Sequence, residues 1–166
     1  MKVAYVFPGQ GSQRVGMGRE LYCTSPKARA TFEEADAVLN TPLSRLCFEG
    51  PEEVLCQTFN AQPAILAASI AYLRATPEFC NENGASTPAF VAGHSLGEYT
   101  ALVAAKVITF ADALRLARER GRLMQVAGEK IPGSMAAVLG LDHDVMQQIC
   151  QETGAEIANV NSPGQI

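Results

Sequence analysis

Residues 88–105 read PAFVAGHSLGEYTALVAA, and this stretch decides the fold. The apolar run at residues 88–92 predicts a buried strand, and residues 99–105 are expected to be helical. Between them, Gly93-His94-Ser95-Leu96-Gly97 fits the Gly-x-Ser-x-Gly pattern of a nucleophile elbow, a sharp turn from a strand into a helix. The stretch therefore predicts an α/β fold in which Ser95 is the candidate nucleophile.

The turn itself would supply part of the chemistry. Glycines at positions 93 and 97 let the backbone fold tightly, and the turn exposes the serine hydroxyl at the N-terminus of the helix. There the backbone N–H of Leu96 can donate a hydrogen bond to an oxyanion. A glycine-rich turn with an inert serine fits the same five residues, so the pattern alone leaves both interpretations open.

A serine needs a general base to become a nucleophile, and the sequence contains only two histidines. His94 is adjacent to Ser95, so on a tight turn its side chain should point away from the hydroxyl. His143 lies at the predicted start of a later helix and is expected to be a solvated surface residue. If Ser95 is catalytic, we therefore expect its base to lie outside this chain.

The N-terminal region begins with the same alternation of strand and loop. Residues 2–7 predict a strand that ends at the glycine loop of residues 8–12. Ser25 is the expected N-cap of the next helix, with Pro26 at its first position. A short helix is expected at residues 52–57.

Two longer helices are expected on either side of the elbow. Residues 62–73, which begin with Gln-Pro, predict a helix that is apolar on all sides, as is typical of a buried helix. Thr109 and Asp112 resemble a capping box in front of a helix at residues 113–126.

The composition changes after Pro132-Gly133. The residues that follow predict a strand, a capped helix and a strand, at 135–139, 142–152 and 156–160. We therefore divide the chain into a first domain, residues 1–130, and the beginning of a second, residues 131–166. A two-stranded unit has little stability of its own, so we expect the chain to be part of something longer.

Composition excludes several classes of function. The 166 residues include 13 basic and 17 acidic ones, a formal charge of −4, which disfavours nucleic acid as a partner. No apolar run approaches the roughly 20 residues that span a membrane, and no signal peptide is visible. Five cysteines without a Cys-x-x-Cys pair, and two distant histidines, predict no metal site and a reduced, cytoplasmic protein.

Five motifs follow one another along the chain: FPGQGSQ at 7–13, QPA at 62–64, GHSLGEY at 93–99, RG followed by MQ at 120–125, and NSPGQ at 161–165. Together they resemble the malonyl-CoA:acyl-carrier-protein transacylases of fatty acid synthesis and the related acyltransferase domains of polyketide synthases. The resemblance extends over the whole chain, and it favours a catalytic Ser95 over an inert one.

The resemblance implies a hydrolase-like, three-layer α/β domain with a small ferredoxin-like subdomain inserted into it. Residues 1–130 would then be part of the large domain, and residues 131–166 would begin the insertion. Members of the family continue well beyond this length, and their catalytic histidine lies in the part that has no counterpart here. We therefore expect residues 1–166 alone to be inactive.

The resemblance also implies a reaction. Ser95 would take malonyl from malonyl-CoA and pass it to the phosphopantetheine thiol of acyl carrier protein, without a cofactor, because the coenzyme A thioester is itself the substrate. The backbone N–H groups of Gln10 and Leu96 would bind the oxyanion. Arg120 would pair with the free carboxylate of the malonyl group, a role that suits the bidentate guanidinium. Without the motif, Arg120 is simply a surface charge in a cluster of charged residues.

Three further residues have weaker assignments. His94 is expected either to touch the acyl group or the oxyanion, or to be a packed, hydrogen-bonded residue of the turn. Gln62 is expected to lie beneath the active site as a structural hydrogen-bonding residue. By the resemblance alone, Asn161 would line the mouth of the acyl pocket.

Two other functions stay open at this point. A serine esterase or thioesterase shares the elbow, although such a hydrolase has no need of a carboxylate clamp such as Arg120. A non-catalytic fragment that associates with a complementary half, or with acyl carrier protein, would explain why no base is present.

Overall fold

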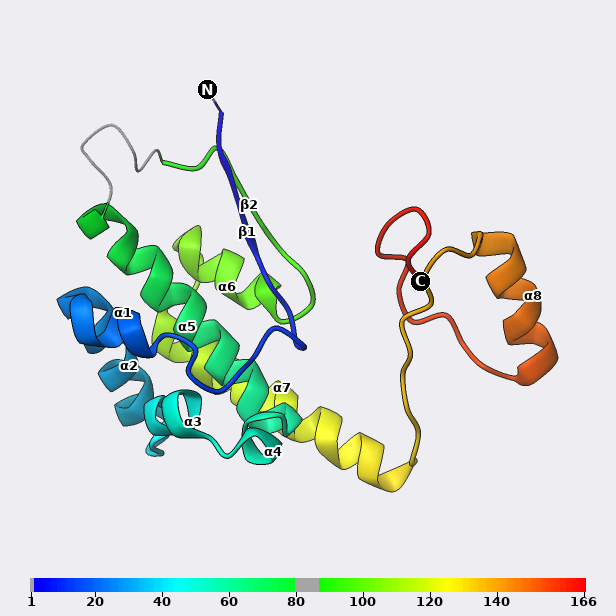
Figure 1. The fold of residues 1–166 in the computed structure, drawn as a ribbon, viewed down its shortest axis with the longest axis horizontal. Helices are drawn as coiled ribbons and strands as arrows, with labels where there is room; N and C mark the ends of the chain where they lie inside the picture. Colours follow the sequence, from blue (N-terminus) through cyan, green and yellow to red (C-terminus); the bar gives the residue numbers. More distant parts are fainter. Residues whose placement is uncertain (1, 80–86) are drawn as a thin grey trace. The chain divides into compact units, whose positions relative to one another are not determined.

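The computed structural model describes residues 2–79 and 87–166 (Figure 1). The chain divides into two compact units, Met1–Lys130 and Ile131–Ile166. The first is mostly helical with one small parallel sheet, so the mixed α/β class is confirmed. No helix of the described residues is long and apolar enough to cross a membrane.

The sheet consists of β1 (Ala4–Phe7) and β2 (Phe90–Gly93), which pair in parallel with Phe7 opposite Gly93. Both predicted strands are therefore present, with bounds shifted by up to two residues. The prediction that the second strand is buried is wrong, because Phe90 is 65% exposed. Val6 on β1 is also exposed, at 74%. In the described part of the chain the sheet has only these two strands, and these exposed side chains show that it is not covered on both faces, as parallel sheets usually are.

Four helices connect β1 to the central helix: α1 (Arg19–Thr24), α2 (Pro26–Leu39), α3 (Leu43–Glu49) and α4 (Glu52–Leu55). The predicted cap of α2 is confirmed, because the Ser25 hydroxyl accepts a hydrogen bond from the Ala28 N–H at 3.1 Å and Pro26 is the first helical residue. Phe32 on this helix is fully buried in the core. The short helix expected at 52–57 is α4, two residues shorter.

Helix α5 (Thr58–Phe79) is the centre of the first unit, and its neighbours are α2 and α7 (Figure 1). The predicted start at Gln62 is wrong by one turn, and Pro63 lies inside the helix. The Gln57 carbonyl accepts the N–H groups of Asn60 and Ala61, both at 2.8 Å, so the helix is already formed before the proline. Residues 60–68 are all buried, and we infer that this burial offsets the backbone hydrogen bond that proline cannot make.

After the elbow, α6 (Gly97–Ala104) leads to α7 (Phe110–Lys130). The predicted capping interaction is present: the Asp112 N–H donates to Thr109 Oγ1 at 3.1 Å, and the Thr109 hydroxyl donates to the Asp112 carboxylate at 2.6 Å. The helix is longer than predicted at both ends. It approaches α5 very closely, because a Cβ added to Gly121 would lie 2.6 Å from the Cα of Phe59.

The second unit contains one helix, α8 (His143–Thr153). Asp142 occupies its N-cap position, although its side chain makes no capping hydrogen bond. The strands predicted at 135–139 and 156–160 are wrong. Of the residues in these two segments, only Leu139 forms an isolated bridge, with Gln165, and residues 156–160 form none. A segment without a continuous partner cannot form a ladder.

The close approach of α5 and α7 predicts opposite effects for two glycines on α7. Gly121→Ala should lower the free energy of unfolding by about 1–3 kcal/mol, the usual cost of overpacking. Gly128→Ala, whose new Cβ meets nothing within 4 Å, should raise it by about 0.5–1 kcal/mol because alanine is the better helix former. Urea denaturation followed by circular dichroism measures both changes, and equal effects would show that the α5–α7 contact is loose.

Candidate functional site

The candidate site is built around the turn from β2 into α6. Ser95 has a φ of +52°, in the left-handed region that residues other than glycine rarely adopt. The turn is held by two backbone hydrogen bonds, from His94 N–H to the Phe7 carbonyl at 3.1 Å and from Gly97 N–H to the His94 carbonyl at 2.8 Å. The strand, the turn and the helix thus occur in the order that the motif predicts.

The turn is as tight as a glycine pair allows. A Cβ on Gly93 would lie 1.9 Å from the carbonyl carbon of Gly97, so no other residue fits there. Leu96 anchors the turn from the inside, because its side chain is fully buried in the hydrophobic core. Ser95 itself is exposed. The result is an accessible hydroxyl on a rigid, strained backbone, which is the arrangement that a serine nucleophile needs.

The glycine loop after β1 begins beside this turn, since Phe7 pairs with Gly93. In the loop, the Gly11 N–H donates to Gln13 Oε1 at 2.8 Å, and the side chain of Gln10 donates to Thr58 Oγ1 at 3.2 Å. Within residues 2–79 and 87–166, the backbone N–H groups of Gln10 and Leu96 donate no hydrogen bond to the protein. Both donors are therefore available to a ligand.

Arg120 joins three elements at the site. Its Nη1 donates to Gln62 Oε1 at 2.7 Å, and its Nη2 donates to Ser95 Oγ at 2.9 Å. Gln62 is completely buried and also donates from Nε2 to the sulfur of Met124 at 3.2 Å. The structure thus brings together Ser95, Arg120 and Gln62 from the elbow, α7 and α5.

Two other arginines around Arg120 on α7 behave as surface residues. Arg115 pairs with Asp112 at 3.1 Å, and Arg122 pairs with Glu119 at 2.6 Å. The hydrogen bond from Arg122 holds the pKa of the Glu119 carboxyl below its ordinary value. Arg120 differs, because no carboxylate among the described residues lies within 4 Å of it. It is a half-buried cation whose protein partners are both neutral.

The remaining predicted residues are all exposed. His94 is exposed on the turn. Asn161 and His143 belong to the second unit and are exposed there, and the His143 ring lies 3.7 Å from the Asp144 carboxylate. Sequence reasoning missed Met124 as the second partner of Gln62. The Met-Gln pair of the fourth motif contains it, but nothing in a local pattern shows which buried amide it meets.

The comparisons with known proteins agree on one family. Residues 4–166 match the family model of the acyl transferase domain. The chain is 50% identical over 170 residues to the malonyl CoA-acyl carrier protein transacylase of Bacillus subtilis, an alignment that covers 99% of this chain and 52% of that protein. It therefore spans about half the length of the curated relatives it matches.

Solved structures agree with this match. The acyl-carrier-protein S-malonyltransferase of Burkholderia pseudomallei superimposes with a TM-score of 0.88 at 46% identity, over 99% of this chain and 53% of that one. A malonyl-transacylase in complex with a type II polyketide synthase acyl-carrier protein superimposes with a TM-score of 0.85 at 44% identity, with the same coverage of the two chains.

Proposed function

Because this chain belongs to the acyl transferase domain family, we propose that it takes part in transferring a malonyl group from malonyl-CoA to the phosphopantetheine thiol of an acyl carrier protein in fatty acid biosynthesis. The observation that carries the proposal is the 2.9 Å hydrogen bond from Arg120 to Ser95 Oγ. It places a cation, which has no acidic partner among the described residues, at the oxygen that would be acylated.

The reaction proceeds in two transfers. Ser95 Oγ attacks the thioester carbonyl of malonyl-CoA while a base takes the hydroxyl proton, and the coenzyme A thiolate leaves and is reprotonated. The carrier thiol then attacks the malonyl ester, and Ser95 recovers its proton. In each transfer the carbonyl oxygen becomes an oxyanion, which the available N–H groups of Gln10 and Leu96 would stabilise.

Arg120 gives the site its preference for a carboxylate. In the malonyl ester, the free carboxylate is separated from the ester carbonyl by a single methylene group, so it lies close to Ser95 Oγ and within reach of the same guanidinium. A charged, bidentate pair is stronger than the present hydrogen bond to a neutral hydroxyl. Acetyl leaves the half-buried arginine without an acid, which disfavours it. An esterase would gain nothing from this cation, so the geometry favours transfer of malonyl over the hydrolase alternative.

The base is proposed to come from outside these residues. The guanidinium of Arg120 stays protonated and cannot accept the serine proton. It donates to Ser95 Oγ, which leaves the hydroxyl hydrogen free to point toward a base. We propose that this base is a histidine outside residues 1–166, so that this chain alone transfers malonyl slowly if at all.

The proposal extends to the surroundings of the site. Residues 1–130 would belong to a hydrolase-like three-layer domain, and residues 131–166 to an inserted ferredoxin-like subdomain from which Asn161 would line the acyl pocket. His94 would contact the acyl group or the oxyanion region. The partners would be malonyl-CoA and an acyl carrier protein in the cytoplasm, supported by the solved complex of a related transacylase with its carrier protein.

Acylation tests the nucleophile. The full-length protein incubated with malonyl-CoA should gain one malonyl group, which intact-mass and peptide mass spectrometry place on Ser95. Ser95→Ala should abolish the adduct, whereas Ser134→Ala, an exposed residue of the second unit, should leave it unchanged. An adduct that persists in Ser95→Ala would refute the assignment.

Selectivity tests the role of Arg120. Arg120→Ala should lower kcat/KM for malonyl transfer by up to two to three orders of magnitude, because losing one partner of a fully buried charged pair costs about 3–5 kcal/mol. Arg120→Lys, which keeps the charge but not the bidentate geometry, should lower it less. Acetyl transfer should change far less. Arg115→Ala, an exposed arginine on the same helix, is the matched control. An equal loss for both acyl groups would make Arg120 structural.

Gln62 should act through Arg120 as a positioning residue. Gln62→Leu removes the acceptor that holds Nη1, a hydrogen bond to a charged group that is worth about 1.5–3 kcal/mol. Malonyl transfer should therefore fall about ten- to a hundredfold, with acetyl transfer of the same variant as the internal control. A parallel fall in both rates, together with a lower melting temperature, would show that Gln62 only supports the core.

A further inference from the structure

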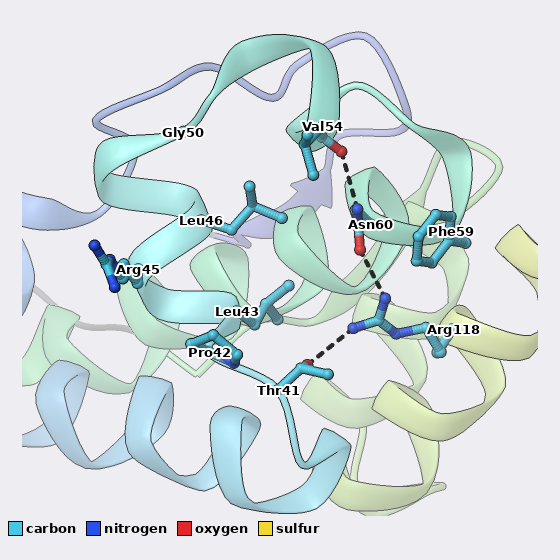
Figure 2. Close-up of a pocket in the computed structure, with 10 residues that line it drawn as sticks. All are labelled: Thr41, Pro42, Leu43, Arg45, Leu46, Gly50, Val54, Phe59, Asn60 and Arg118. Carbon is cyan, nitrogen blue, oxygen red and sulfur yellow. Dashed lines mark hydrogen bonds between the residues drawn. The ribbon is translucent and has the colours of Figure 1, made fainter.

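A second arginine of α7 lies in a pocket of its own. The pocket has a volume of about 310 Å³, and Figure 2 shows it between the segment Thr41–Gly50, Val54, the start of α5, and Arg118. This volume is at the lower end of the roughly 300–1,000 Å³ that small-molecule sites occupy. Arg118 and Arg120 are two residues apart, and such positions on a helix do not face the same side.

The lining is apolar between two arginines, Arg45 and Arg118, which Figure 2 shows on opposite sides of the pocket. Leu46 and Val54 provide hydrocarbon surface, whereas Leu43 is only 2% exposed. Arg118 donates from Nη1 to Asn60 Oδ1 at 2.7 Å and from Nη2 to Thr41 Oγ1 at 3.0 Å. Figure 2 shows these two hydrogen bonds beside the ring of Phe59, and the guanidinium carbon lies 5.3 Å from the ring centroid.

The charge of Arg118 has no acidic partner in the described part of the chain. No aspartate or glutamate lines the pocket, and none lies within 4 Å of Arg118. Burial is the cause that lowers the pKa of its guanidinium. The other arginine of the pocket, Arg45, is exposed and already pairs with Glu49 at 3.0 Å.

The guanidinium of Arg118 is held in place, and not all of its N–H donors are used. A guanidinium has five N–H donors, of which Asn60 and Thr41 take two, so three remain. Those two neutral acceptors and the ring of Phe59 hold its plane in place, which reduces the side-chain entropy that a ligand would otherwise have to overcome.

We propose that this pocket binds a small amphipathic monocarboxylate, with the carboxylate on Arg118 and a short hydrocarbon chain against Leu46 and Val54. A single guanidinium matches one carboxylate bidentately, whereas a phosphate dianion would call for more cationic donors than this end of the pocket supplies. Binding here does not use Ser95 and is independent of the transfer reaction.

Octanoate is the probe. Titrated into the full-length protein by isothermal calorimetry and by ¹H–¹⁵N NMR, it should bind with shifts at the amides of Thr41, Leu46 and Asn60. It should bind at least tenfold more tightly than 1-octanol, which offers the chain without the charge, and acetate, which offers the charge without the chain, should not bind measurably. The Ser95→Ala variant, which lacks the proposed malonyl acceptor, should bind octanoate as tightly as the unchanged protein does.

Variants test the contributions of the charged and the apolar parts of the pocket to binding separately. Arg118→Gln should bring octanoate down to the affinity of octanol, Arg118→Lys should keep part of the preference, and the exposed control Arg115→Gln should change nothing. Val54→Thr, which places a hydroxyl on the apolar wall, should weaken octanoate and octanol alike. Equal binding of octanoate and octanol, shifts elsewhere in the protein, or the same loss in Arg115→Gln and Arg118→Gln would overturn the proposal.

Discussion

The hydrogen bonds of Arg120 hold the candidate site together. One guanidinium donates both to a fully buried amide of α5 and to the hydroxyl of a strained turn that leads out of the sheet. The two acceptors are 33 residues apart in sequence, and neither can shift without breaking a charge-assisted hydrogen bond. The close contact of α7 with α5 at Gly121, the residue next to Arg120, keeps the guanidinium within hydrogen-bonding distance of both acceptors.

The charge of Arg120 costs free energy as long as no carboxylate pairs with it. Both partners of Arg120 are neutral, so the half-buried charge is solvated by dipoles alone, and a buried cation without a counter-ion is held at a disadvantage. Under the proposed function, a substrate carboxylate would remove that disadvantage, whereas an uncharged acyl group would not. Selectivity would then follow from a charge that the described part of the chain leaves uncompensated, and the buried Gln62 keeps that charge directed at the serine.

Local signals in the sequence predicted what depends on a few neighbouring residues. The caps at Ser25 and Thr109 and the glycine pair around Ser95 act within one turn of chain, and all of them are found in the structure. The start of α5 was missed because a proline normally marks a helix end, whereas here burial of the surrounding apolar residues dominates. The strands predicted at 135–139 and 156–160 failed because a strand exists only when a partner completes its ladder.

The site shows the same division between local and long-range information. The serine turn could be recognised from five residues, but the contact of Arg120 with Gln62 joins residues 58 apart, and only the resemblance to a family connected them to one function. The arginines of α7 illustrate the difference between local and long-range information. In the sequence alone these arginines look equivalent. In the folded protein Arg115 and Arg122 pair with acids on the surface, Arg120 meets the serine, and Arg118 meets an apolar pocket. Helical geometry turns neighbouring residues toward different surroundings, so the function of each arginine is decided by the partners that the rest of the chain supplies.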